Sequence, residues 1–145
     1  MKKVCIINGP NLNLLGKREK EIYGDKSFDD IYNELKIYGE SKNIELSYFQ
    51  SNIEGEIIDK IHECMGKVDF IVINPGALTH YSYSIHDAIT SSKIPTIEVH
   101  ISNIFSREEW RKISVISPAA VGVISGLGLD VYKLALIYVA DYRKK

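Results

Sequence analysis

Five short apolar runs, rich in β-branched residues, constrain the fold of this chain more than any other feature of its sequence. They are four to six residues long and lie at residues 4–7, 44–49, 70–73, 96–99 and 119–124. Runs that are apolar nearly throughout are typical of strands buried on both faces of a parallel sheet. The run from Ile44 alternates more between apolar and polar residues, so we expect an edge strand there.

Helical patterns separate these runs. Apolar residues recur at helical spacing in residues 28–35, 57–65 and 85–89. Ser27, Ser51 and Ser106 each precede an acidic residue by three positions, a spacing typical of the capping boxes that start helices. The last predicted helix, residues 129–139, is apolar on more than one face, so we expect part of it to contact another subunit.

Strands that alternate with helices predict right-handed βαβ units around one sheet. We therefore expect a flavodoxin-like α/β fold: a doubly wound, five-stranded parallel sheet with helices on both faces. The length of the chain favours a single catalytic domain over residues 1–145. The strand order of a Rossmann half remains an alternative.

The balance of charges excludes some classes of function. The chain has 18 Lys and Arg against 19 Asp and Glu, which argues against a general nucleic-acid or membrane-surface binder. No apolar run approaches the roughly 20 residues of a membrane span, and the apolar run after Lys3 is too short for a signal peptide. Cys5 and Cys64 lack metal-ligand spacing, and we expect reduced, buried thiols in a cytoplasmic protein.

Polar residues collect where three predicted strands end, which is the edge that binds the ligand in a doubly wound sheet. Residues 8–24, after the first strand, far exceed a typical βα loop of roughly 2–6 residues, and their Arg, Lys and Tyr side chains indicate an active-site lid. A disordered loop is the alternative. Asn74 and His80 follow the third strand, and Glu98 and His100 stand at the end of the fourth.

These groups suit acid–base chemistry. Tyr23 lies five residues after Arg18, and a nearby guanidinium favours the phenolate and lowers the pKa of a phenol. Tyr23 could then remove a proton from carbon while His100 donates one to a leaving hydroxyl. Glu98 could orient the His100 imidazole, and Asn11 with an ordered water could steady an enolate oxygen.

Other functions remain open from the residues alone. Metal ligation would need convergent histidine and carboxylate groups, for which the candidates are His80, His100, Asp87 and Glu98. A phosphate- or nucleotide-binding module would use the loop at Gly9 or the Gly-Leu-Gly at residues 126–128. A receiver-like domain would need acidic residues where Asn8 and Asn74 stand, and we discount it.

Several blocks of residues occur in an order that resembles type II 3-dehydroquinate dehydratase. The blocks are residues 8–12, 18–24, 74–80, 98–103 and 107–111, and residues 117–128 resemble the closing segment of that family. The resemblance covers nearly the entire chain. It implies conversion of 3-dehydroquinate to 3-dehydroshikimate by anti elimination through an enolate, in the shikimate pathway of aromatic amino acid biosynthesis. It also implies that no cofactor, metal or Schiff base takes part.

The resemblance assigns a role to each site residue. It makes Tyr23 the base, Arg18 its activator, His100 the general acid and Asn11 the residue that positions water at the enolate. It places the substrate carboxylate on Asn74, Ile101 and Ser102. It places the ring hydroxyls on His80, Asp87 and Arg111, and it gives Arg107 a part in ordering the lid.

The resemblance also implies a homo-oligomer, a dodecamer built of trimers, in which Asp87 is supplied across a trimer interface. His86 stands where many members of the family have Arg, and residues 81–83 are more aromatic than is common. These departures concern the subunit contact and not the reaction.

Overall fold

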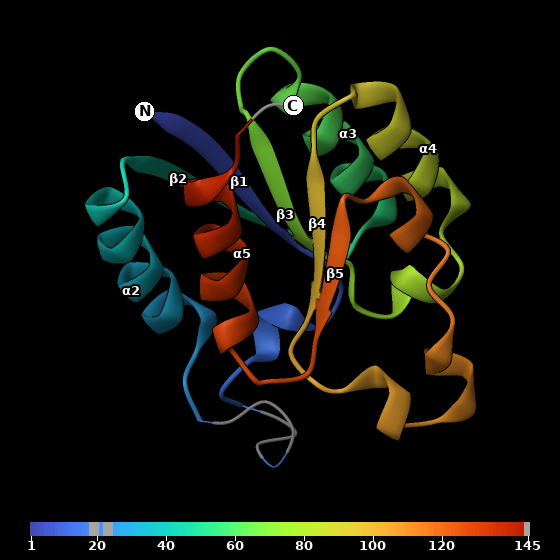
Figure 1. The fold of residues 1–145 in the computed structure, drawn as a ribbon. Coiled ribbons are helices and arrows are strands. Elements are labelled where there is room, and N and C mark those ends of the chain that lie inside the picture. The colour runs from blue at the N-terminus through green and yellow to red at the C-terminus, as the bar shows by residue number, and fades with distance from the viewer. Residues whose placement is uncertain (18–20, 22–24, 144–145) are drawn as a thin grey trace.

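The computed structural model describes residues 1–17, 21 and 25–143, and a five-stranded parallel sheet forms its centre (Figure 1). The strands are β1 (Lys2–Asn8), β2 (Ile44–Gln50), β3 (Phe70–Asn74), β4 (Thr96–His100) and β5 (Gly122–Ser125). They pair in the order β2-β1-β3-β4-β5, and every pair is parallel. This is the flavodoxin-like order, so the predicted fold is confirmed and the Rossmann-half alternative is wrong.

Helices cover both faces of the sheet, which makes it doubly wound (Figure 1). They are α2 (Phe28–Ser41) and α5 (Asp130–Asp141) on one face, and α3 (Glu54–Cys64) and α4 (Tyr83–Ser92) on the other. Along β1, neighbouring side chains enter different cores: Ile6 packs with residues of α2 and α5, and Ile7 with residues of α3 and α4. Of the helices described, none is long and apolar enough to cross a membrane.

Two of the three predicted capping boxes are wrong. Ser27 caps α2 as expected, because its Oγ accepts a hydrogen bond from a backbone N–H in the first turn. Ser51 is not the N-cap of α3, because its hydroxyl accepts from a nearby backbone N–H and donates to Glu56. Ser106 bonds back to the carbonyl of Asn103, and residues 101–121, all of them described, form only short 3₁₀ helices.

Strand β5 is shorter and more exposed than the sequence predicted. The predicted run begins at Ala119, but Ala119 belongs to a 3₁₀ helix (Ser117–Ala119) and the strand starts at Gly122. Val123 is 43% exposed, and within the described chain no strand pairs with the outer edge of β5. The prediction failed because an apolar run looks the same whether its own fold buries it or leaves it at the surface. The expected edge strand at Ile44 is confirmed as β2.

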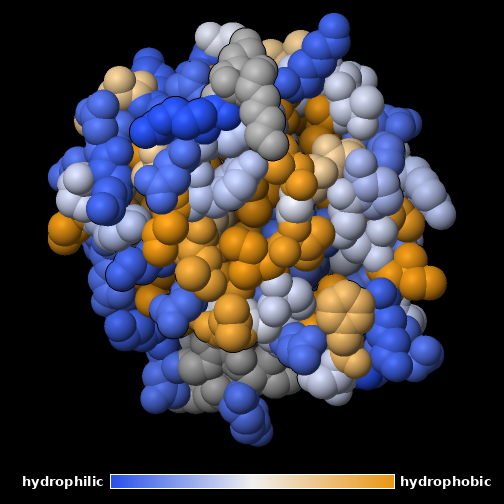
Figure 2. Space-filling model, in the orientation of Figure 1, coloured by the Kyte–Doolittle hydropathy of each residue, from blue (hydrophilic) through white to orange (hydrophobic). Residues whose placement is uncertain are grey.

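Helix α5 is only half covered by the rest of the chain. Leu136 and Val139 are fully buried, whereas Leu134, Ile137 and Tyr138 are 36%, 38% and 43% exposed. Figure 2 shows apolar side chains gathered over the middle of this face of the molecule, where Figure 1 places α5 and β5. The helix is therefore apolar on more than one side, as predicted, and presents an uncovered apolar surface.

The loops after β1 and β3 touch through their backbones. The two strands end in register at Asn8 and Asn74, and the Gly9 N–H donates to the Asn74 carbonyl over 2.8 Å. A Cβ on Gly9 would lie 2.5 Å from the carbonyl oxygen of Pro75, so only glycine fits there. Gly76, with φ of +61°, lies close to Pro10 in the first loop: a Cβ on Gly76 would lie 3.1 Å from the Pro10 carbonyl oxygen. This contact fixes the spacing of the two loops at the carboxyl edge of the sheet.

Candidate active site

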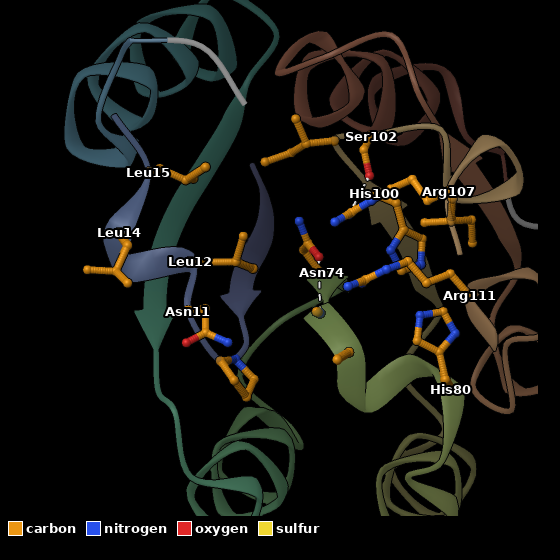
Figure 3. A pocket seen from close by; sticks show the side chains of 15 residues that line it. Asn11, Leu12, Leu14, Leu15, Asn74, His80, His100, Ser102, Arg107 and Arg111 are labelled. Atoms are coloured by element: carbon orange, nitrogen blue, oxygen red, sulfur yellow. Dashed lines mark hydrogen bonds between the residues drawn. The ribbon is translucent and has the colours of Figure 1, made fainter. Parts of the chain in front are cut away.

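A cavity of about 210 Å³ opens at the carboxyl edge of the sheet, between the loops that follow β1, β3 and β4. It lies beside the point where the strand order reverses, which is where doubly wound sheets bind ligands. Drug-sized ligands occupy pockets of roughly 300–1,000 Å³, so this cavity suits a smaller molecule. Figure 3 shows a leucine-rich wall facing a wall of histidine, arginine, serine and asparagine side chains.

The structure brings most of the predicted site residues together. Those that line the cavity are Asn11, Asn74, His80, His100, Ile101, Ser102, Arg107 and Arg111. Glu98 lies behind His100 and is fully buried. Asp87 is exposed on α4 and does not line the cavity of its own chain. Arg18 and Tyr23 lie outside the described residues.

The apolar wall of the cavity comes from the segment after β1. Asn11 has left-handed backbone angles there, with φ of 71°, and its N–H donates to Asn52 Oδ1 over 3.0 Å. The next three residues form a 3₁₀ helix (Leu12–Leu14) whose leucines, with Leu15, line the cavity. These leucines belong to the stretch that the sequence predicts as part of a lid, and they were not among the predicted site residues.

Glu98 and His100 form a hydrogen-bonded pair at the end of β4. Two residues apart on one strand, they project from the same face of the sheet. His100 Nε2 lies 2.5 Å from Glu98 Oε2, and the two side chains are 5% and 0% exposed. Because a carboxylate can only accept, Nε2 carries a proton, and Nδ1 is the ring nitrogen left for a ligand.

Glu98 is ionised although it is buried. Burial raises the pKa of this carboxyl group, but the hydrogen bond and charge of His100 and the hydroxyls of Thr79 and Ser117 outweigh burial and hold the pKa below its usual range. The resulting carboxylate accepts the hydrogen bond from His100 Nε2. Sequence reasoning found the Glu98–His100 pair but not the hydroxyls.

His80 presents a hydrogen-bond acceptor to the cavity. Its Nδ1 lies 2.7 Å from the carbonyl oxygen of Ile113, so Nδ1 donates. Burial lowers the pKa of His80, the hydrogen bond to Ile113 raises it, and the charges of His100 and Arg111 lower it; the net shift is downward. A neutral His80 ring with its proton on Nδ1 leaves Nε2 free to accept a hydrogen bond from a ligand hydroxyl.

Arg111 and His80 share a contact with Trp110, a residue that the sequence analysis did not single out. The Arg111 guanidinium carbon lies 4.0 Å from the centre of the Trp110 ring. Arg111 Nε also donates to Glu108 Oε2 over 2.5 Å. The His80 ring meets Trp110 edge-on, with 5.2 Å between ring centroids. The indole therefore supports two side chains that line the cavity.

A second guanidinium lies on the same wall. Arg107 Nη1 donates to Ser102 Oγ over 3.1 Å, which keeps both side chains beside the cavity. Arg107 and Arg111 give this wall a positive charge, so it suits a ligand that carries a carboxylate or several hydroxyl oxygens.

Tyr132, on α5, orients Asn74 from beneath the cavity. Its fully buried hydroxyl accepts from Asn74 Nδ2 over 3.1 Å and donates to Asn8 Oδ1 over 2.8 Å. The Gly76 N–H donates to Asn74 Oδ1 over 3.2 Å. Both ends of the Asn74 amide are thereby held by the protein, which presents the side chain to the cavity in one orientation.

Replacing Tyr132 with Phe is expected to lower the free energy of unfolding by about 1–3 kcal/mol, because it leaves buried polar atoms of Asn8 and Asn74 unpaired. Urea unfolding at one protein concentration measures the change, and Tyr38→Phe, at a half-buried residue on α2, is the matched control because phenylalanine keeps the ring. Equal unfolding curves for the Tyr132 variant and the wild type would show that this hydrogen-bonded link does not stabilise the fold.

The glycine-rich loop before α5 does not form a phosphate cradle. The Gly126 N–H donates to the carbonyls of His100 and Ser102, and the Gly128 N–H donates to the carbonyl of Ile101, each over 3.1 Å. The loop therefore fixes the chain after β4, and the N–H groups of both its glycines are occupied. The Gly9 N–H is also taken, by Asn74. Among the described side chains, no group of three or more His, Cys, Asp or Glu residues is placed to hold a metal ion.

Comparison with known proteins points to one family. The family model "Dehydroquinase class II" matches residues 2–140. A 3-dehydroquinate dehydratase of Caldicellulosiruptor bescii is 61% identical to this chain over 94% of each sequence. One from Fusobacterium nucleatum is 53% identical over 99% of each.

Solved structures agree with these sequence relatives. The crystal structure of a type II dehydroquinase from Butyrivibrio crossotus has a TM-score of 0.92 and 53% identity, covering 97% of this chain and 98% of its own. That of a type II dehydroquinase from Propionibacterium acnes has a TM-score of 0.94 and 42% identity, covering 98% of both chains.

Proposed function

This chain belongs to the class II dehydroquinase family, and from that premise we propose that the cavity described above is where it dehydrates 3-dehydroquinate. The chain is a type II 3-dehydroquinate dehydratase, a hydro-lyase of the shikimate pathway, as its sequence indicated. The observation that carries the choice of cavity is the buried Glu98–His100 pair, whose histidine lines a small cavity that also has two arginines in its wall.

The proposed reaction is an elimination in two proton transfers. Tyr23, with its phenolate favoured by Arg18, takes a proton from the carbon beside the ketone, and the electron pair forms an enolate. The enolate then collapses: the carbon–hydroxyl bond breaks, a carbon–carbon double bond forms, and His100 gives a proton to the departing oxygen. Water and 3-dehydroshikimate are the products. The roles of Tyr23 and Arg18 rest on their match to the family blocks, and the role of His100 rests also on its geometry.

The remaining residues are proposed to bind and orient the substrate. Asn74, with the backbone of Ile101 and Ser102, would hold the carboxylate, and this assignment is supported by the fixed orientation of the Asn74 amide. His80 and Arg111 would bind ring hydroxyls, which agrees with the acceptor that His80 presents. Asn11 would position a water at the enolate oxygen. Arg107, bonded to Ser102, would act on the lid.

The proposed assembly is a dodecamer built of trimers, in which Asp87 serves the cavity of a neighbouring subunit. Two observations support it: Asp87 is exposed and away from its own cavity, and α5 and β5 present an uncovered apolar surface. Light scattering should then give a mass about twelve times that of the 16.4 kDa chain. A monomeric mass for active enzyme would contradict the assembly and the role of Asp87.

We also propose that residues 1–145 form a single catalytic domain, since one sheet carries both cores. A cytoplasmic location is proposed as well, and it is supported by the two free, buried thiols of Cys5 and Cys64, which suit a reducing compartment.

The direct test is to mix purified protein with 3-dehydroquinate and follow the ultraviolet absorbance of the conjugated product. Absorbance should rise, and neither EDTA nor borohydride should prevent the rise, because the proposed chemistry uses no metal and no imine. If the absorbance did not rise with a folded oligomer, the proposed function would be contradicted. A phosphate- or nucleotide-binding module would then be the alternative function. That alternative is weakened by the occupied N–H groups of Gly9, Gly126 and Gly128.

A further inference from the structure

The segment from Ile113 to Ser117, here called the serine segment, runs behind the cavity and reaches Glu98 with two hydroxyls. Ser114 Oγ lies 3.0 Å from both carboxylate oxygens of Glu98, and Ser117 Oγ donates to Glu98 Oε1 over 2.8 Å. Neither serine lines the cavity. Their contact with the site is therefore made through Glu98.

A third hydroxyl reaches Glu98 from the loop after β3. Thr79, which is fully buried, donates from Oγ1 to Glu98 Oε2 over 2.7 Å. The Val115 N–H donates to the Thr79 carbonyl over 2.8 Å, so this loop and the serine segment are joined directly. Glu98 is thus surrounded by hydroxyl donors on the side away from the cavity, and its remaining donor is His100.

The serine segment is also anchored by two histidines. His80 Nδ1 donates to the Ile113 carbonyl, and His86 Nδ1 donates to the Val115 carbonyl, each over 2.7 Å. The segment therefore fixes the orientation of His80 as well as the position of Glu98. His86, on α4, does not line the cavity.

We propose that Thr79, Ser114 and Ser117 are positioning residues for the dehydration: their hydroxyls hold the Glu98 carboxylate in one place and in its charged form, and Glu98 thereby aims the His100 ring at the leaving hydroxyl. This inference rests on the proposed function. It goes beyond the roles that the family resemblance assigns, because none of the three hydroxyls touches the cavity.

The physical reason is the cost of burying a carboxylate. A fully buried carboxylate remains charged only when its lone pairs accept hydrogen bonds, and bonds to charged groups are among the strongest in proteins. Removing one hydroxyl raises the pKa of Glu98 and frees its side chain to turn away from His100. The titratable groups that act on Glu98 are His100 on its own strand and, from the loop after β3, His80.

Loss of these hydroxyls should also change how kcat depends on pH. The pair needs Glu98 ionised, so activity falls as pH drops through the pKa of that carboxyl group. A variant that raises this pKa should therefore move the acid limb of the kcat profile to higher pH. A purely structural role for the hydroxyls would leave that limb in place.

The test compares Ser117→Ala and Thr79→Val with the wild-type enzyme. Ser117 is half-exposed and Val keeps the shape of Thr79, so both variants should fold. Each should lower kcat by about tenfold or more, the scale of losing a hydrogen bond to a charged group, with KM changed by less than about threefold. Ser117→Thr, which keeps the hydroxyl, should restore kcat. Ser92→Ala removes a buried hydroxyl of α4 that bonds only to nearby backbone, and it is the control.

A second readout does not depend on turnover. The nitrogen resonances of the His100 ring in labelled protein should show the proton on Nε2 in the wild type, and its signal should shift or broaden in both variants but not in Ser92→Ala. An inactive wild type with the expected resonances would overturn the proposed function alone. An active wild type whose two variants keep its kcat, its acid limb and its His100 signals would overturn the positioning role.

Discussion

His100→Gln is expected to lower kcat by about three orders of magnitude, within the roughly 10²–10⁴-fold range of general acid catalysis. Glutamine can still donate to Glu98 from Nε2, so the pair behind the cavity is preserved, but glutamine cannot give up a proton to the leaving hydroxyl. Substrate binding should therefore change much less than kcat. Steady-state kinetics and calorimetric titration with 3-dehydroquinate measure the two quantities.

The matched control for this variant is His62→Gln, because His62 is exposed on α3, outside the cavity. It should keep wild-type kinetics. If the His100 variant retained a kcat within a few-fold of wild type, another group would have to be the acid, and the geometry of the Glu98–His100 pair would need a different explanation.

Tyr23→Phe is expected to abolish measurable turnover while leaving substrate binding largely intact. Phenylalanine keeps the ring but lacks the oxygen that takes the proton, and the proposed carboxylate contacts of Asn74, Ile101 and Ser102 are untouched. The loss should appear in kcat, with a small change in the calorimetric affinity. Tyr38→Phe, on α2 and outside the cavity, should behave as wild type. Near-normal activity of the Tyr23 variant would remove it from the mechanism.

Isotope exchange separates the two variants further. In D₂O, an enzyme that retains its base but lacks its acid can form the enolate and return it, so His100→Gln should exchange the substrate proton beside the ketone without forming product. Tyr23→Phe should do neither. If both variants exchanged the proton equally, the assignment of base and acid to Tyr23 and His100 would be wrong.

The parts of the fold that could be predicted from sequence are those whose burial leaves a simple pattern. The central strands β1, β3 and β4 are covered on both faces, so their sequences are apolar throughout and recognisable. Helix starts were harder, because the hydroxyls of Ser51 and Ser106 bond to other groups once the chain is folded. The exposure of β5 was missed because hydropathy does not say what covers a strand.

Some of the site residues could likewise be predicted from sequence, and others could not. Asn74, Glu98 and His100 could be found because a parallel sheet brings the ends of its strands to one edge. Tyr132 could not, since it lies 58 residues from Asn74 and 124 from Asn8, and its role depends on how α5 packs. Thr79, Ser114 and Ser117 are ordinary polar residues in sequence, and only the fold directs their hydroxyls to one carboxylate.

Trp110, which supports Arg111 and His80, is the only tryptophan in the chain. Intrinsic fluorescence excited at the indole therefore comes from one residue, which contacts two side chains that line the cavity. A ligand that draws Arg111 or His80 inward changes the surroundings of that ring, so occupancy can be read as a change in emission without any label. The inactive variants can be titrated with the true substrate in this way. Stopped-flow mixing then measures the rate of substrate binding separately from the rate of the chemical step.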